Sequence, residues 1–248
     1  KIWDATTGAF KNRFRGRNNK PIKGDITCIC LDDRKRKLFV GTSGGNLKTL
    51  NIKNGAIGRK FKKDDRKKKS SREEDKQDIS CLHYYHEDHD DGSKTSVLIA
   101  SSWDKKVRFY DDGDSAEEVS TARHAMSKHT EAVNYIDFRA HDKFCASCGD
   151  DGIIHIFNYV SLRAEGQIEN LDPLDPGPQE QLAEMKVCRF LADTELLVTS
   201  DLDGYIKFWC ISSSSHPLKN KLVAYMRDES PGELIKLKED QMPEDPKP

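Results

Sequence analysis

The sequence has no apolar stretch that could span a bilayer, because no run approaches the roughly 18 apolar residues that a transmembrane helix needs. It also has no excess charge of one sign: 41 Lys and Arg stand against 42 Asp and Glu, for a net charge of −1. A chain without a global field is not a general binder of nucleic acid or anionic lipid. The 7 cysteines have no disulfide-framework spacing, which favours reduced thiols in a cytosolic compartment.

A repeated segment ending is the main feature that is present. Each of five segments ends in an aromatic or aliphatic residue followed by a small or acidic one: Trp3-Asp4, Leu50-Asn51, Tyr110-Asp111, Phe157-Asn158 and Trp209-Cys210. The endings are 47, 60, 47 and 52 residues apart. Such a period indicates a repeat architecture and fixes the fold before any local assignment.

Each interval between endings contains the same sequence of elements. An alternating apolar segment comes first, as in 26–31, 79–84, 133–138 and 185–190. A short apolar run closed by small residues comes second, as in 38–42, 97–101, 144–147 and 196–200. A turn rich in Gly and Asp precedes the repeated ending, and a more polar segment such as 57–61 follows it. Alternation with period two predicts strands, and four strands per repeat predict the blades of an all-β propeller.

The chain resembles the WD-repeat (WD40) β-propeller family. The best match joins Lys128-His-Thr-Glu-Ala-Val-Asn-Tyr-Ile-Asp-Phe138, Ala146-Ser-Cys-Gly-Asp-Asp-Gly152 and Phe157-Asn158. More narrowly, the segments 26–37, 100–112 and 199–205 look like the large WD-repeat proteins of ciliary and flagellar axonemes, some of which carry EF-hands. The narrower resemblance implies a structural part attached to doublet microtubules.

We expect four complete blades and the end of another. The predicted segments are a truncated blade end at 1–18; blades at 25–61, 79–122, 129–168 and 185–225; a charged insertion at 62–78; an acidic Pro-rich insertion at 169–184; and an extended or disordered tail at 228–248. Because Trp3 closes a repeat that lacks its earlier strands, we expect the chain to be a piece of a longer propeller chain.

The resemblance implies a buried structural polar network in the best-matching blade. Its members would be His129, Ser147 and Asp151, and Phe157 would take the position of the family's Trp. Phe has no N–H, so the network would have one donor fewer. A His, a Ser and an Asp also suggest a hydrolase triad. No nucleophile elbow accompanies them, so we expect no catalytic site.

Two charged insertions are the candidate partner contacts. The first is basic, with Lys62, Lys63, Arg66, Lys67, Lys68 and Lys69, and the second is acidic, with Asp172 and Asp175. A basic run can bind acidic tails, such as those of tubulin, or nucleic acid. Only Phe61 adds an aromatic to the run, which disfavours nucleic acid. A solvated loop without a partner is the alternative for both insertions.

A histidine-rich segment is the most metal-like cluster. It contains His83, His86, His89 and the carboxylates Asp88, Asp90 and Asp91, which suit zinc. We expect His83 in a strand and the others in a long hairpin loop, as a solvated acidic loop. No metal and no other cofactor is therefore predicted.

These features favour a non-catalytic protein-interaction scaffold of the ciliary or flagellar axoneme. Its partners would be protein subunits of a large assembly, with no membrane contact, and its location the cytoplasm and cytoskeleton. The alternative is a WD-repeat subunit of another intracellular complex that binds nucleic acid or phosphate through the basic run.

Overall fold

The computed structural model describes residues 2–12, 22, 24–62, 77–113, 119–175, 177, 181–212, 219–227 and 235–236. Every regular element in these residues is a β-strand, so the all-β prediction is confirmed. No helix in the described ranges is long and apolar enough to cross a membrane. The chain divides into two compact units, residues 1–126 and 127–248.

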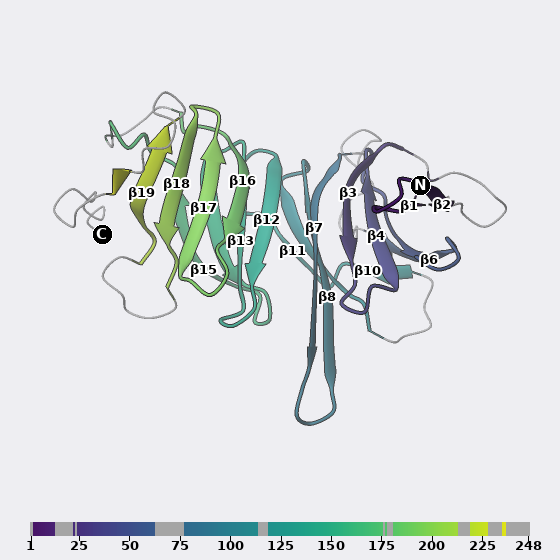
Figure 1. Cartoon of the computed structure of the whole chain (residues 1–248). Helices are drawn as coiled ribbons and strands as arrows, with labels where there is room; N and C mark the ends of the chain where they lie inside the picture. The colour runs from purple at the N-terminus through teal and green to yellow at the C-terminus, as the bar shows by residue number, and fades with distance from the viewer. Residues whose placement is uncertain are drawn as a thin grey trace, which may run out of the picture. The chain divides into compact units, whose positions relative to one another are not determined.

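Among its described residues, the first unit contains three sheets (Figure 1). The smallest pairs β1 (Ile2–Trp3) with β2 (Phe10–Asn12). A second sheet has the order β10-β6-β5-β4-β3, formed by β3 (Ile26–Leu31), β4 (Lys37–Thr42), β5 (Leu47–Asn51), β6 (Ile57–Lys62) and β10 (Val119–Thr121). A third has the order β11-β9-β8-β7, formed by β7 (Ile79–Asp88), β8 (Lys94–Ser102), β9 (Lys106–Asp111) and β11 (His124–Met126).

In the part of the second unit that the structure describes, two antiparallel sheets follow chain order. One is formed by β12 (Val133–Arg139), β13 (Phe144–Gly149), β14 (Ile153–Asn158) and β15 (Arg163–Glu169). The other is formed by β16 (Met185–Phe190), β17 (Leu196–Asp201), β18 (Tyr205–Cys210), β19 (Lys221–Arg227) and β20 (Ile235–Lys236). Consecutive hairpins of this kind are the strand order of a propeller blade.

Turns between the second and third strands of the sheets carry the expected glycines. Gly152 has φ +68° and Gly204 has φ +82°, a region that side-chain-bearing residues rarely adopt. A Cβ on Gly152 would also lie 2.3 Å from the Cβ of Leu182. In the β8–β9 turn Lys105 takes the same conformation, with φ 68°. The Gly and Asp pattern in the sequence therefore marks real hairpin turns.

Each unit has its own apolar core, formed where neighbouring sheets face one another. In the first unit Phe39, Leu98 and Tyr110 are almost fully buried in one cluster. In the second unit Ile154, Cys188 and Leu197 belong to another. All seven cysteines are unbridged.

The outer edge of the β7–β9 sheet differs from the predicted range 79–122. Residues 119–121 form β10, which pairs in parallel with β6 of the preceding sheet. The outer strand is β11, which pairs with β9 in antiparallel register. The chain changes partner at Ala122, whose N–H bonds the Lys62 carbonyl, while the Arg123 N–H bonds the Phe109 carbonyl. Both segments are only three residues long, so alternation could not assign either to a sheet.

The β7–β8 hairpin is longer than the sequence pattern indicates. The first strand continues to Asp88 and the second begins at Lys94, so the ladder runs from Ile79↔Ser102 to Asp88↔Lys94. Figure 1 shows this pair of strands extending well beyond the other strands of its sheet. The prediction that His86 and Asp88 lie in a loop is therefore wrong. The extension is polar, so it gives no apolar alternation from which to predict strands.

The predicted extended or disordered tail contains a short strand. Ile235 and Lys236 form β20 and pair with Tyr225 and Ala224 of β19. The remainder of 228–248 lies outside the described residues, as do residues 13–18 of the predicted blade end.

Candidate functional site

The structure brings His129, Ser147 and Asp151 together in the second unit. Nδ1 of His129 lies 2.9 Å from the Asp151 carboxylate, and its Nε2 lies 2.8 Å from Oγ of Ser147. Because a carboxylate only accepts, Nδ1 carries a proton and donates to Asp151, while Nε2 and the Ser147 hydroxyl are hydrogen-bonded to each other. Burial alone would raise the pKa of Asp151, but hydrogen bonds from His129 and from the Thr130 and Ile153 amides hold that pKa below its usual value.

The order of these groups is that of a hydrolase triad, but the nucleophile is inaccessible. The Ser147 side chain would have to reach a substrate carbonyl. Ser147 lies in the middle of β13 and has no exposed surface. A buried hydroxyl flanked by β12 and β14 can orient His129, but it cannot attack an external substrate.

A basic residue two positions before the repeated ending was missed in the sequence. Arg108 donates two hydrogen bonds to Asp104, at 2.9 and 2.7 Å. Lys207, 1% exposed, lies 2.9 Å from the Asp201 carboxylate and 2.6 Å from the Asn170 side-chain oxygen. His155 takes this position in the β12–β15 sheet. The sequence signal that could have found this position is its spacing: the basic residue follows the turn residue Asp104, Asp151 or Asp203 by four positions.

The third member of the family network differs between the two sheets of the second unit. Trp209 donates its indole N–H to Thr199 over 2.9 Å. At the equivalent position Phe157 is buried but has no donor to offer Ser147.

One group in the described residues presents three possible metal ligands: His129, Asp151 and His155, whose ligand atoms lie within 4.8 Å of one another. Both nitrogens of His129 are already hydrogen-bonded, and Asp151 also accepts two backbone N–H bonds. A metal would have to break these bonds, so the arrangement favours a polar network over a metal centre.

The histidines of the β7–β8 hairpin do not converge. His83 and His86 are three residues apart on one strand, so they point to opposite faces. His86 Nδ1 lies 2.8 Å from Oγ of Ser96, and His89 Nε2 lies 2.7 Å from Oγ1 of Thr95. These cross-strand bonds engage the two rings separately.

The charged insertions are described only in part. Lys62 is the exposed last residue of β6, whereas Lys63, Arg66, Lys67, Lys68 and Lys69 lie outside the described residues. Asp172 and Asp175 form an isolated β-bridge. The Tyr205 hydroxyl donates to Asp172 over 3.0 Å, so this insertion is anchored to β18.

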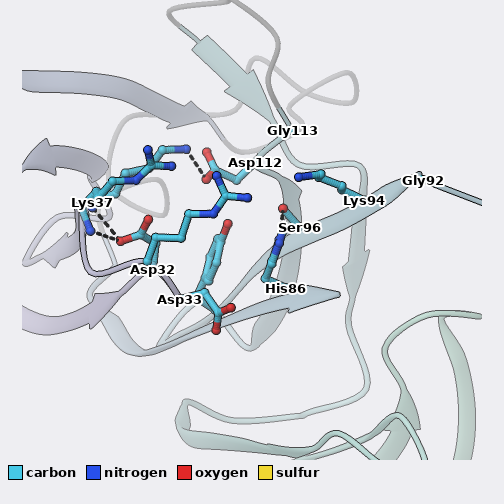
Figure 2. Close-up of a pocket in the computed structure, with 12 residues that line it drawn as sticks. Asp32, Asp33, Lys37, His86, Gly92, Lys94, Ser96, Asp112 and Gly113 are labelled. Atoms are coloured by element: carbon cyan, nitrogen blue, oxygen red, sulfur yellow. Dashed lines mark hydrogen bonds and ion pairs between the residues drawn. The ribbon is translucent and has the colours of Figure 1, made fainter. Parts of the chain in front are cut away.

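A cavity of about 350 Å³ lies in the first unit between the β3–β4 turn and the extended β7–β8 hairpin. We call it the hairpin pocket. It is lined by Asp32, Asp33, Arg34, Arg36, Lys37, Tyr84, His86, Gly92, Lys94, Ser96, Asp112 and Gly113. Figure 2 shows Asp32 and Lys37 on one side, His86 and Ser96 on the other, and Asp112 between them.

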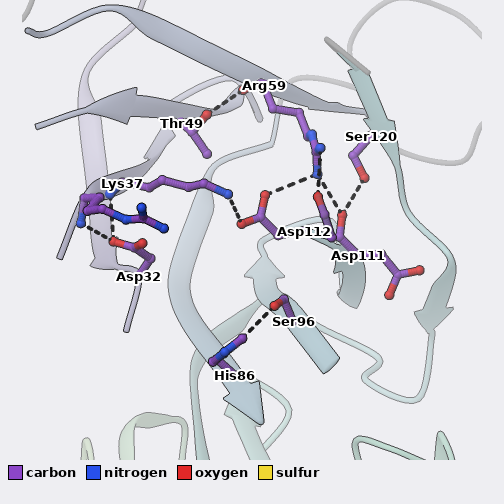
Figure 3. A network of polar contacts seen from close by, with 11 residues as sticks. Asp32, Lys37, Thr49, Arg59, His86, Ser96, Asp111, Asp112 and Ser120 are labelled. Carbon is purple, nitrogen blue, oxygen red and sulfur yellow. Dashed lines mark hydrogen bonds and ion pairs between the residues drawn. The ribbon is translucent and has the colours of Figure 1, made fainter. Parts of the chain in front are cut away.

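An ion-pair network forms one wall of the hairpin pocket (Figure 3). The Asp112 side chain is 1% exposed and accepts from Lys37 over 2.7 Å and from Arg59 over 3.2 Å. Arg59 also donates to the Gly113 carbonyl over 3.1 Å. These residues come from three segments up to 75 positions apart, so no local sequence pattern could have identified the network.

Comparisons with known proteins agree with this geometry. The family model described as "WD domain, G-beta repeat" matches residues 120–158, which include His129, Ser147 and Asp151. This match shows that residues 120–158 resemble a WD repeat, and the antiparallel sheets agree with it. A curated relative, Cilia- and flagella-associated protein 337 B of Tetrahymena thermophila, is 21% identical over 208 residues. The alignment covers 84% of this chain but only 14% of the relative's length. The chain thus resembles a ciliary protein at low identity.

Proposed function

We propose that the chain is a non-catalytic scaffold of the ciliary or flagellar axoneme that associates with doublet microtubules and other axonemal proteins. The observation that carries this proposal is a WD repeat in an all-β chain similar to a cilia- and flagella-associated protein. WD repeats indicate a protein-interaction scaffold, since rigid sheets present loops to partners. The cytoskeleton of the cilium is then the expected location.

The buried polar groups support a structural and not a catalytic role. Ser147 is inaccessible, and His129 and Asp151 bond one another at side-chain exposures of 3% and 2%. Satisfied buried networks of this kind specify one packing of the sheets.

Two insertions are the proposed partner contacts. The basic one is residues 62–78, where Lys62 leads into Lys63, Arg66, Lys67, Lys68 and Lys69. The acidic one carries Asp172 and Asp175 on a segment anchored to β18. A basic and an acidic contact would suit two different partner surfaces.

Co-sedimentation with demembranated axonemes tests the proposal. One variant replaces residues 63–76 with a neutral Gly-Ser segment, and so leaves Arg59 and β6 intact; a second variant carries Asp172→Asn and Asp175→Asn. We expect the first variant to lose most of its sedimentation and the second to lose part of it. If both variants sediment with axonemes as well as the wild type does, the assignment of the two insertions as partner contacts is wrong. Binding to RNA with steep salt dependence, in place of axonemes, would favour the nucleic-acid alternative.

A further inference from the structure

The hairpin pocket contains cations that its own carboxylates do not neutralise. Asp32 accepts from the Arg36 and Lys37 amides, at 2.6 and 2.7 Å, so it caps its own turn. Asp112 is held between Lys37 and Arg59. The third lining carboxylate, Asp33, is exposed.

Two guanidinium groups remain available. Arg34 and Arg36 are exposed, and neither side chain makes a hydrogen bond or an ion pair with the residues that the structure describes. Lys94 pairs with Asp88 at 3.4 Å, but both side chains are about half exposed or more, at 49% and 64%, and such a pair is weak. The planar guanidinium has several donors arranged to hold a carboxylate or a phosphate.

The extended hairpin builds the other wall of the pocket and has no role in the apolar core. Residues 86–96 lie beyond the core-facing part of β7 and β8 and supply His86, Gly92, Lys94 and Ser96 to the lining. His86 and Ser96 are bonded across the two strands, so this wall is fixed before any ligand arrives. A preformed wall lowers the entropy that binding must overcome.

The lining favours a peptide over a nucleic acid. Tyr84 is the only Phe, Tyr or Trp among the described lining residues, and it stacks on Phe39 at 5.0 Å and 23°, so one of its faces is already covered. Single-stranded nucleic acid needs open aromatic faces and a continuous positive groove, whereas Asp33 and Asp112 interrupt the positive charge here. A peptide with spaced carboxylates fits a mixed lining better than a phosphate backbone does. At about 350 Å³ the pocket is at the small end of ligand sites and accommodates part of a peptide.

We propose that the hairpin pocket binds side-chain carboxylates of an acidic peptide segment of a partner protein, with Arg34 and Arg36 as the anion-binding groups. The proposal rests on the scaffold function and adds the chemistry of one partner. Of the basic insertion, the described residues 62, 77 and 78 do not line the pocket.

Gly113 offers a variant that blocks the pocket without disturbing its walls. A Cβ built on Gly113 meets no atom within 4 Å, and its φ lies outside the left-handed region. Only its backbone carbonyl accepts the bond from Arg59. Gly113→Ala should therefore be silent, whereas Gly113→Glu places a competing carboxylate at the pocket.

The experiment measures fluorescence anisotropy of a short labelled peptide in which Glu alternates with Gly, with the Gln analogue for comparison. We expect the intact chain to bind the Glu peptide but not the Gln peptide. Arg34→Gln with Arg36→Gln should weaken binding at least about tenfold, because two charge-assisted contacts are lost. Gly113→Glu should weaken it similarly, and Gly113→Ala should not. Unchanged thermal melting of each variant verifies that it is folded.

Equal binding by Gly113→Glu and Gly113→Ala would overturn the proposal. So would a loss that appears only with Lys67→Gln and Lys68→Gln, because the basic insertion would then be the binding site. Tighter, arginine-dependent binding of inorganic phosphate or of a single-stranded RNA would also overturn it. These outcomes are independent of axoneme co-sedimentation, so failure of the pocket and failure of the scaffold role are distinguishable.

Discussion

Acidification should destabilise the second unit through the buried imidazole of His155. This residue is 8% exposed, its ring packs edge-on against His129 at 4.5 Å, and its Nε2 is buried without a hydrogen-bond partner in the described residues. Burial, and secondarily the nearby charges of His129 and Lys128, lower its pKa from 6.5 to about 4, although Asp151 opposes this. Below pH 6.5 the unfolded chain therefore binds a proton that the folded chain does not accept until the pH approaches about 4.

The lost stability follows from the two pKa values. When the pH falls from 7 to 5, this difference in proton binding should lower the free energy of unfolding by about 2 kcal/mol. Urea unfolding at several pH values measures it. His155→Phe cannot titrate and should remove most of this pH dependence. The control His141→Gln, at a histidine whose side chain is 61% exposed, should retain it. The same slope in wild type and His155→Phe, or an NMR titration of His155 near 6.5, would refute the reasoning.

Three further substitutions, with Phe157→Leu as a control, test the other networks by denaturant unfolding. Asp112→Ala removes the buried carboxylate that Lys37 and Arg59 share, and should lower the free energy of unfolding by about 3 kcal/mol. A loss below about 1 kcal/mol would mean that these ion pairs are screened by solvent. Asp201→Ala removes the carboxylate that pairs with the buried Lys207 ammonium, and should lower the free energy of unfolding by about 3–5 kcal/mol. An unchanged free energy of unfolding would contradict the ion pair. Trp209→Phe removes the hydrogen bond to Thr199 and should lower the free energy of unfolding by about 1 kcal/mol. Phe157→Leu removes no hydrogen bond, so it should leave Ser147 bonded to His129. A double-mutant cycle with Ser147→Ala can verify this.

Alternation of apolar and polar residues was a sufficient signal for some of the strands. Residues 26–31 and 185–190 are strands over the same residues that the pattern predicts. It failed in the β7–β8 extension, where polar residues occupy both faces. It also failed at β10, whose parallel pairing with β6 depends on the neighbouring sheet and leaves no mark in the local sequence.

The candidate sites divide in the same way. His129, Ser147 and Asp151 could be named from the sequence because the resemblance to the WD-repeat family implies a His, a Ser and an Asp at these positions of a blade. The hairpin pocket could not be named, because Asp112 meets Lys37 and Arg59 only when two sheets pack together. The basic insertion stays a prediction, since residues 63–76 lie outside the described ranges.

Fractionation of isolated cilia tests the scaffold proposal most directly. Cilia are demembranated with detergent, and an epitope tag on the full-length protein is followed in the soluble membrane-matrix fraction and in the axonemal pellet. The proposal predicts that the protein remains with the axonemes and is released only by high salt or denaturant. Full recovery in the detergent-soluble fraction, or absence from cilia, would contradict it.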